Sequence, residues 1–342
     1  MGTWDMCQMM YYFQYVLGFE NKTNKKAVMG TVFHRAMQVL GDKKVAQKKG
    51  ETFLENDDLP DMTFKQCDDL EYVMRECFEY YKKHEEDVGL TEAEYKTCLG
   101  WFRKALAFKG GMLDPRNQDV DSTEEFFDLE IDREWASYDF EVDGKKFEGK
   151  LGIKGTIDLI IRENDAYFQV LDYKTGKRLN WATGKEKTYE DLCSDKQLML
   201  YYYALKRLYP ERDFYVSIYY VNDGGLFDIV FGPEDFEKAE KMFERRFREV
   251  QRTTKPKCIS RDCSHWKCQK LCKFSEPVDG RFGSSPEDAD KPVCQYFREM
   301  IDEKGIDYVT NEYANVSKIG AYGAGGGRLA EDTAKNDGKP SI

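Results

Sequence analysis

The sequence contains no run of about eighteen or more apolar residues, so no segment is long enough to cross a bilayer as a helix. A secretory signal is also missing. Residues 1–20 are aromatic and interrupted by Gln, Asp and Glu, whereas a signal peptide has a basic start and a plain apolar stretch. No internal repeat is evident. We therefore expect a soluble protein that stays in the cytoplasm and is not secreted.

The chain also lacks an excess of positive charge, since its formal net charge is -11. This net charge argues against a protein whose whole surface is basic and binds nucleic acid, but it is compatible with a local basic channel. The candidate for such a channel is residues 241–257, KMFERRFREVQRTTKPK, where several arginines lie off the apolar stripe of a predicted helix. A solvated helix face is the simpler interpretation of these arginines.

Apolar residues make up 41% of the chain, which is enough for a sizeable core in one large domain or two modest ones. Helical periodicity covers the first forty residues, with a turn at Gly30, and returns over residues 62–108. Strand-like alternation follows over residues 125–175. The later segments predict a helix over 187–209, two strands over 214–231 and then the basic helix. This order is typical of an α/β protein.

Two carboxylates and a lysine interrupt the strand pattern. LDYKTGK places Asp172 and Lys174 two residues apart, so both point to one face of a strand, and Asp158 lies in the preceding strand, GTIDLII. A short hairpin joins these strands, so the carboxylates can approach each other. They would repel in an apolar setting unless a cation lay between them, and hard oxygen ligands suit Mg²⁺ or Mn²⁺. A surface ion pair is the alternative for Asp172 and Lys174 taken alone.

Three further residues complete an ordered pattern. His34 lies in GTVFHRAMQVL, and Gln197 and Tyr201 lie one helical turn apart in QLMLYYYAL. Taken one at a time, each has a simpler interpretation. His34 would be a helix histidine with its hydrogen bonds satisfied, Gln197 an amide on a helix surface, and Tyr201 part of an aromatic core. Together, the motifs G-T-V-F-H, G-T-I-D, L-D-Y-K-T-G and Q-L-M-L-Y resemble the RecB-like branch of the PD-(D/E)xK nucleases, which includes the AddB nuclease domain, CRISPR adaptation nucleases and phage exonucleases. The resemblance runs from Cys7 to about Cys272.

This resemblance implies a restriction-endonuclease-like α/β core, with a central mixed β-sheet flanked by helices, an N-terminal helical region and a C-terminal cysteine segment. It implies a Mg²⁺- or Mn²⁺-dependent enzyme that hydrolyses DNA phosphodiester bonds. The expected activity is that of an exonuclease acting on DNA ends in recombination, repair or phage DNA processing, in a bacterial or phage-infected cell. The expected partners are DNA ends or single strands, together with a helicase, recombinase or integrase, and no membrane is involved.

The resemblance also implies a role for each motif residue. The metal ligands would be His34, Asp158, Asp172 and the Tyr173 carbonyl. Lys174 would be the catalytic lysine, and the residues that place DNA and the lysine would be Gln197 and Tyr201. One departure is Arg35, which stands where many relatives carry a glutamate after the histidine. It removes a further carboxylate ligand and leaves a side chain that we expect could contact phosphate.

Ten cysteines in a chain without a secretion signal are not expected to form disulfides. Four of them follow one another closely in PKCISRDCSHWKCQKLCKF: Cys258, Cys263, Cys268 and Cys272. Taken locally, these thiolates are compatible with a structural Zn²⁺ site, although the gaps of four, four and three residues are not those of Cys-x-x-Cys knuckles. The resembled family implies a 4Fe–4S cluster instead.

The expected ligands of that cluster are Cys7, Cys263, Cys268 and Cys272, with Cys258 as the alternative. Such a cluster would be structural and would tie the N-terminal helix to the C-terminal segment. The cysteines that we interpret as ordinary core or surface thiols are Cys67, Cys77, Cys98 and Cys193. Cys294 has no predicted role.

The expected domain layout is a nuclease domain over residues 1–277, with a helical insertion over about 35–120 and the iron-sulfur segment at 258–272. Residues 278–342 are expected to be a loop and a flexible Gly-rich tail. Two alternatives belong to other functional classes. One is a non-catalytic DNA-binding or assembly subunit that keeps the nuclease fold, and the other is a zinc-stapled protein unrelated to nucleases.

Overall fold

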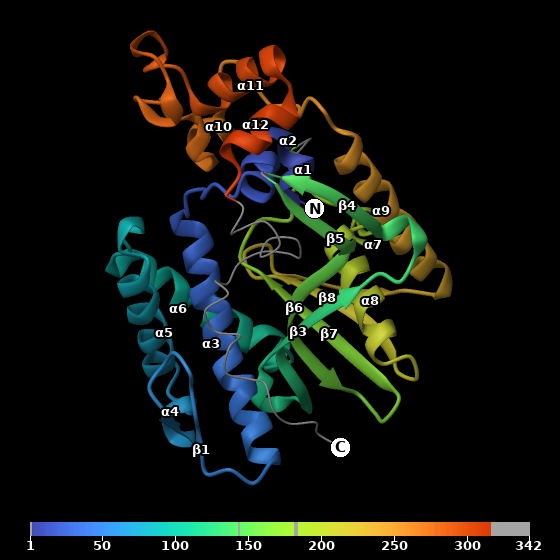
Figure 1. The fold of residues 1–342 in the computed structure, drawn as a ribbon. Coiled ribbons are helices and arrows are strands. Elements are labelled where there is room, and N and C mark those ends of the chain that lie inside the picture. Colours follow the sequence, from blue (N-terminus) through green and yellow to red (C-terminus); the bar gives the residue numbers. More distant parts are fainter. Residues whose placement is uncertain (1, 143, 181–183, 316–342) are drawn as a thin grey trace. The chain divides into compact units, whose positions relative to one another are not determined.

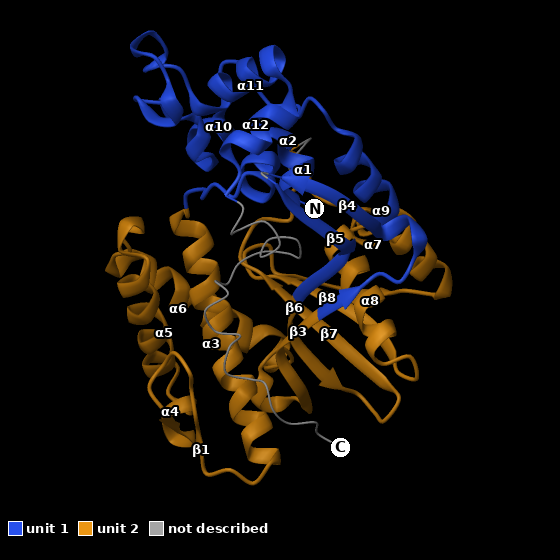
Figure 2. Ribbon diagram, viewed as in Figure 1, with its two compact units in different colours: residues 1–22, 128–155, 243–342 blue, residues 23–127, 156–242 orange. Residues whose placement is uncertain are grey.

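The computed structural model describes residues 2–142, 144–180 and 184–315 (Figure 1). The predicted Gly-rich tail from residue 321 onward lies outside the described residues. Among the helices that the structure does describe, none is long and apolar enough to span a membrane. The chain divides into two compact units: unit 1 takes residues 1–22, 128–155 and 243–342, and unit 2 takes residues 23–127 and 156–242 (Figure 2).

Unit 2 is built around a five-stranded sheet of order β3-β6-β7-β8-β9. These strands are β3 (Val120–Glu130), β6 (Gly152–Arg162), β7 (Tyr167–Lys174), β8 (Asp213–Tyr220) and β9 (Gly225–Val230). The β6–β7 and β8–β9 pairs are antiparallel, whereas β7 and β8 are parallel. The parallel pair needs a crossover, which α7 (Tyr189–Cys193) and α8 (Lys196–Leu208) supply. The predicted mixed sheet flanked by helices is confirmed.

One face of this sheet is covered by α3 (Lys25–Lys48). Helices α5 (Leu70–His84) and α6 (Glu92–Ala107) pack against α3 on the side away from the sheet (Figure 1). Asn24 begins α3 by accepting a hydrogen bond from the Ala27 N–H at 3.1 Å. The predicted turn at Gly30 is wrong, because α3 continues through this residue. A Cβ at Gly30 would lie 3.2 Å from Thr175 Oγ1, so the glycine allows α3 to approach the end of β7.

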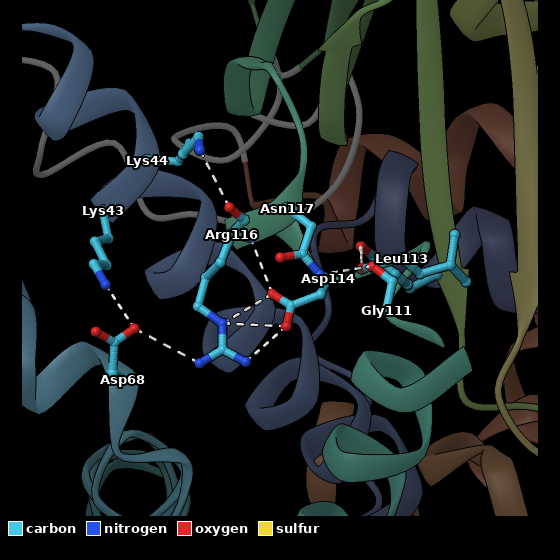
Figure 3. A network of polar contacts seen from close by, with 9 residues as sticks. Lys43, Lys44, Asp68, Gly111, Leu113, Asp114, Arg116 and Asn117 are labelled. Carbon is cyan, nitrogen blue, oxygen red and sulfur yellow. Dashed lines mark hydrogen bonds and ion pairs between the residues drawn. The ribbon is translucent and has the colours of Figure 1, made fainter. Parts of the chain in front are cut away.

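The helical pattern predicted over residues 62–108 corresponds to separate helices. After the short strand β2 (Met62–Thr63), Asp69 ends α4 (Phe64–Asp68) and caps α5, and the left-handed Gly89 separates α5 from α6. Between α3 and α4, an ion-pair network fixes the helices: Lys43 Nζ lies 2.6 Å from Asp68, which also lies 3.6 Å from Arg116 (Figure 3). The remaining short elements of unit 2 are β1 (Phe53–Leu54), η2 (Glu86–Val88), η3 (Phe108–Gly110) and η4 (Pro115–Asn117).

Unit 1 contains a hairpin and a group of helices. The hairpin pairs β4 (Ser137–Val142) with β5 (Lys145–Lys150). The helical elements are α1 (Gly2–Met6), α2 (Gln8–Tyr11), the π-helix η1 (Tyr12–Val16), η5 (Glu134–Ala136), α10 (Trp266–Leu271), η6 (Lys273–Ser275), η7 (Arg281–Gly283), η8 (Pro286–Asp288), α11 (Val293–Lys304) and α12 (Ile306–Tyr313). The apolar core of unit 1 includes Phe13 and Phe297, whose ring centroids lie 5.4 Å apart.

Two predictions for the C-terminal third can be compared with the structure. Residues 293–313, expected to be loop, form α11 and α12, because their apolar side chains complete the unit 1 core. The basic helix is α9 (Pro233–Arg252). Within unit 1, its Arg246 pairs with Asp5 and with Glu249, the latter at 2.7 Å, and Arg248 pairs with Glu244 at 2.8 Å. The acidic partners favour a solvated, ion-paired helix face over a basic channel.

Gly41 sits where α3 approaches the sheet most closely. A Cβ at this position would lie 2.4 Å from Thr123 Cγ2 and 3.2 Å from Leu159 Cδ1. We predict that Gly41→Ala lowers the free energy of unfolding by about 1–3 kcal/mol, because the new methyl group overpacks this contact. Urea denaturation measures the change.

Gly100 in α6 is the matched control, because a Cβ there would have no atom within 4 Å. Gly100→Ala should stabilise the protein by up to about 1 kcal/mol through helix propensity alone. Equal effects at the two glycines would contradict the close packing of α3 on the sheet.

Candidate active site

The polar motif residues converge in unit 2 from three kinds of element. His34 comes from the middle of α3, Asp158 from β6, and Asp172 and Lys174 from the end of β7. In the antiparallel register, Leu159 pairs with Leu171, so the next step along the two strands brings Asp158 beside Asp172. The alternation of strand side chains thus sets two carboxylates side by side.

Asp158 is held by α3 and by the backbone of β7. Its Oδ1 lies 3.2 Å from His34 Nδ1, and its Oδ2 accepts a hydrogen bond from the Tyr173 N–H at 2.8 Å. Burial opposes the charged carboxylate, but the His34 charge and hydrogen bond lower the pKa of Asp158. Burial also opposes the charged imidazole, yet the Asp158 carboxylate raises the pKa of His34. Asp158 and His34 therefore favour each other's charged forms.

Asp172 is held by a different set of side chains. Lys174 Nζ donates to its Oδ1 at 2.7 Å, while Gln197 Nε2 and Tyr201 OH each lie 3.4 Å from the same oxygen. Gln197 also donates to Tyr201 OH at 2.5 Å. The two α8 residues are presented by a helix that begins where the Asp195 side chain accepts the Gln197 N–H at 2.9 Å. Gln197 and Tyr201 lie four residues apart on one face of α8, so both side chains reach the Asp172 carboxylate.

Asp172 is 1% exposed, and burial together with the Asp158 charge raises its pKa despite the opposing Lys174 ammonium. Its Oδ2 lies 2.6 Å from Lys174 Nζ but makes no hydrogen bond of good geometry. A buried carboxylate oxygen that is not fully satisfied, next to a second carboxylate, fits a site that accepts a divalent cation. The donor set consists of hard oxygens and an imidazole, which suits Mg²⁺ or Mn²⁺.

Glu124 belongs to the same group of donors, although no motif in the sequence includes it. One ligand atom each from His34, Glu124 and Asp158 lie within 4.8 Å of one another. Glu124 lies inside β3 but has a left-handed backbone, with φ of 45°. This conformation costs a non-glycine residue about 1–2 kcal/mol and so has to be held by its surroundings. The sequence signal for this donor was the adjacent acidic pair Glu124 and Glu125. The left-handed backbone of Glu124 could not be predicted from that pair.

The residue before Glu124 is tied to α3. Thr123 Oγ1 donates to Asp42, and Asp42 lies 3.6 Å from the Arg35 guanidinium. Arg35 itself is 8% exposed and pairs with Asp58 at 2.5 Å. The expectation that Arg35 contacts phosphate is therefore wrong, because its guanidinium is buried in ion pairs. Its role in the structure is to support the Asp42–Thr123 contact next to Glu124.

The cysteine segment lies in unit 1, and its thiols gather in the apolar core of that unit. Those that are buried or packed against this core are Cys7, Cys258, Cys263, Cys268, Cys272 and Cys294. They come from four places: the junction of α1 and α2, the loop before α10, α10 with its end, and α11. Cysteine sulfurs are soft donors that suit zinc or iron-sulfur centres, so this donor set fits either.

Cys294 was given no role from the sequence, yet it lies among these thiols. It is 7% exposed and lies in the unit 1 core, which also contains Cys263 and against which Cys258 packs. The sequence gave no signal for this, because 21 residues separate Cys294 from Cys272 and the intervening stretch has the composition of a loop. The interpretation of Cys67, Cys77 and Cys98 as core thiols agrees with their burial in the unit 2 core, and Cys193 is half-buried in α7.

Comparison with known proteins gives a family for the chain. Residues 3–275 match the model of the PD-(D/E)XK nuclease superfamily. No curated protein matched. Among solved structures, a candidate exonuclease from Eubacterium rectale is 11% identical with a TM-score of 0.35, covering 81% of this chain and 96% of its own. SSO0001 is 15% identical with a TM-score of 0.24, covering 62% and 83%. Because the family match spans well over half of the sequence, this chain belongs to the PD-(D/E)XK nuclease superfamily.

Proposed function

We propose that this protein is a divalent-metal-dependent DNA nuclease of the RecB-like branch and that it acts as an exonuclease at DNA ends. The observation that carries the proposal is the buried pair Asp158 and Asp172, with His34 against one carboxylate and Lys174 against the other. Beyond these two ion pairs, Asp172 Oδ2 makes no hydrogen bond, and Glu124 adds a third carboxylate beside Asp158. In a nuclease fold, this surplus of carboxylate oxygen supports a metal-dependent phosphodiesterase.

The residues that would hold Mg²⁺ or Mn²⁺ are His34, Glu124, Asp158, Asp172 and the Tyr173 carbonyl. When bound, the cation supplies Lewis acidity to the phosphate and to the attacking water. His34 and Glu124 add donors on the Asp158 side, where their ligand atoms already lie within 4.8 Å of one another. The Tyr173 N–H keeps Asp158 oriented, because it donates to Oδ2 and leaves Oδ1 facing His34.

Lys174 is the proposed catalytic lysine. Its ammonium lies beside Asp172 and at the surface of the site, where its side chain keeps 30% of its exposure. Burial disfavours its charge, but the Asp172 and Asp158 carboxylates raise its pKa, so it stays a cation. A fixed positive charge at this position can orient the attacking water and offset the charge that develops on the phosphate. Gln197 and Tyr201 keep Asp172 and Lys174 in place from α8.

The thiols of unit 1 are proposed to hold a structural 4Fe–4S cluster, with Cys7, Cys263, Cys268 and Cys272 as ligands. One cysteine before the histidine motif and three after the nuclease core match the ligand arrangement of the resembled family, which favours this cluster over the alternative of Zn²⁺.

The biological setting is proposed from the same resemblance. Processing of DNA ends in recombination, repair or phage DNA metabolism fits an exonuclease inside a bacterial or phage-infected cell, accompanied by a helicase, recombinase or integrase. The proposed nuclease domain spans residues 1–277, in keeping with the family match at residues 3–275. Residues 293–313 are then a helical addition to it, with no assignment to the nuclease chemistry.

We predict that the purified protein degrades end-labelled linear DNA with Mg²⁺ or Mn²⁺, leaves covalently closed circles intact and is inactive in EDTA. Asp172→Asn and Lys174→Met should each lower the rate by at least about 10²-fold, because they remove the metal ligand and the positioned cation. DNA binding, measured by fluorescence anisotropy, should remain, since it depends mostly on phosphate contacts elsewhere.

Lys82→Met on the exposed surface of α5 is the control for Lys174→Met and should leave the rate unchanged. Cleavage of circles as fast as linear DNA would refute the exonuclease assignment alone. Near wild-type cleavage by Asp172→Asn or Lys174→Met would refute the active site. A wild-type protein that binds DNA without cutting it under any metal would favour the non-catalytic binding subunit.

Glu124 gives an independent prediction. Glu124→Gln should weaken Mn²⁺ binding about 10-fold or more and lower the cleavage rate, because it removes a charged donor and keeps the side-chain shape. Titration calorimetry measures the affinity.

The neighbouring glutamate is the matched control. Glu125 accepts a hydrogen bond from Tyr209 OH at 3.2 Å, which Glu125→Gln preserves. This variant should bind Mn²⁺ like the wild type. If the two variants behaved alike, Glu124 would be a structural residue of β3 and no ligand.

A further inference from the structure

The basic residues of this acidic chain are unevenly distributed. Residues 252–273 contain seven Lys and Arg and a single Asp, whereas the whole chain has 52 basic and 63 acidic residues. The same segment contains the four closely spaced cysteines, and it belongs to unit 1. The positive charge that the sequence places near residues 241–257 is thus concentrated slightly further along, around the thiols.

Four cations of this segment surround the thiols on the solvent side. The cysteines of the segment lie in or against the unit 1 core. Because consecutive Cα atoms are about 3.8 Å apart, a residue one or two positions from such a cysteine has to stay close to the thiol group. Within α10, for example, Cys268 is buried and Lys270 is exposed. The cations that meet this condition and reach solvent are called the basic surface: Lys257, Arg261, Lys270 and Lys273.

The basic surface is not neutralised by neighbouring acids. Among the residues that the structure describes, none of its four cations forms an ion pair. The nearby carboxylates are engaged by other groups, because Asp262 accepts from the Ser264 N–H at 3.1 Å and Asp302 lies 2.8 Å from Lys255. Like charges that are held together without counter-charges repel each other, so an anion that binds among them is stabilised.

The thiols themselves do not account for these cations. The charge of a buried thiolate is best offset by a group that contacts its sulfur, as Arg298 Nη1 contacts Cys258 Sγ at 3.2 Å. Lys257, Arg261 and Lys270 are instead exposed, and screening by water and salt weakens their interaction with a buried centre. Unpaired, exposed cations clustered on one segment of an acidic chain are the electrostatic signature of a site for an extended polyanion.

We propose that the basic surface binds the phosphate backbone of the DNA substrate. The proposal rests on the nuclease function proposed above, which makes DNA the polyanion. It does not depend on which metal the thiols bind, because none of the four cations is a proposed ligand. Lysine and arginine contact phosphates without identifying bases, so the surface supplies affinity for DNA and no sequence specificity.

The experiment is a salt titration of DNA binding by the full chain. Fluorescence anisotropy is measured with a labelled single strand and with its duplex, in the Asp172→Asn chain, so that the DNA stays intact. Replacing all four cations of the basic surface by Gln should lower the affinity about 10-fold or more. The slope of log affinity against log salt should become shallower by about 0.7–0.9 for each phosphate contact that is lost.

Two exposed lysines on α5 provide the matched control for the pair Lys270→Gln with Lys273→Gln. Lys82→Gln with Lys83→Gln removes the same number of charges from unit 2 and should leave the affinity and the salt slope of the parent chain unchanged. Thermal stability and metal content are measured for every variant. Should the fourfold variant fail to fold, Arg261→Gln and Lys270→Gln carry the test singly, each with a slope shallower by about 0.7–0.9.

Unchanged affinity and slope in the fourfold variant would overturn the proposal. An equal loss of affinity in the Lys82 and Lys83 control would also overturn it, because binding would then follow net charge and no particular surface. A wild-type chain that cuts DNA with no metal, but whose binding depends on the basic surface, would refute the nuclease and keep the surface. Cleavage that depends on Asp172, with binding that is indifferent to the four cations, would keep the nuclease and refute the surface.

Discussion

Two carboxylates buried side by side are the constraint on which unit 2 depends. Asp158 and Asp172 come from adjacent strands, and because both carboxylates are largely buried their repulsion has to be offset by the surrounding groups. His34 from α3 offsets one charge and Lys174 from β7 the other, while Gln197 and Tyr201 reach Asp172 from α8. The sheet and the helices on its two faces therefore have to keep their positions for either carboxylate to remain ionised.

Contacts outside the site keep these elements in place. Tyr173 stands between Asp172 and Lys174 in the sequence of β7, but its side chain points to the opposite face, into the apolar core, and its OH donates to the Leu113 carbonyl at 3.1 Å. The next residue, Asp114, accepts from Arg116 at 2.6 Å, and Arg116 continues the network to Asp68 and α3 (Figure 3). On the other side, Gly41 allows α3 to touch Thr123, which precedes the strained Glu124. The strain at Glu124 is thus held by packing that is independent of the donor group itself.

Unit 1 is organised by a different kind of interaction. Its core combines aromatic rings with thiols, and its segments are far apart in sequence: the α1–α2 junction, the cysteine segment and α11. Such a core is small, and a metal centre that joins several segments can supply stability that limited apolar burial does not. Helices α11 and α12 extend this unit past the region shared with the superfamily, and they bring Cys294 and Arg298 to the thiols.

The sequence by itself determined the fold class and most of the donors of the candidate site. Strand alternation and helical periodicity report which side chains are buried, so the sheet, α8 and the positions of Asp158, Asp172 and Lys174 could be predicted from local patterns. The same reasoning failed at Gly30, which continues a helix because a close contact with Thr175 favours glycine there, and at residues 293–313, whose helices pack on the core of unit 1.

Only the tertiary structure decided the other members of the two sites. Arg35 was expected to contact phosphate but is buried, because its guanidinium pairs with Asp42 further along α3 and with Asp58 in the loop beyond it. Glu124 enters the donor group through a left-handed backbone that no residue preference predicts, and Cys294 reaches the thiols across a segment that resembles a loop. Local patterns record what each residue does within its own helix or strand. Which distant side chains share a site depends on packing between elements, and that is settled only when the chain folds.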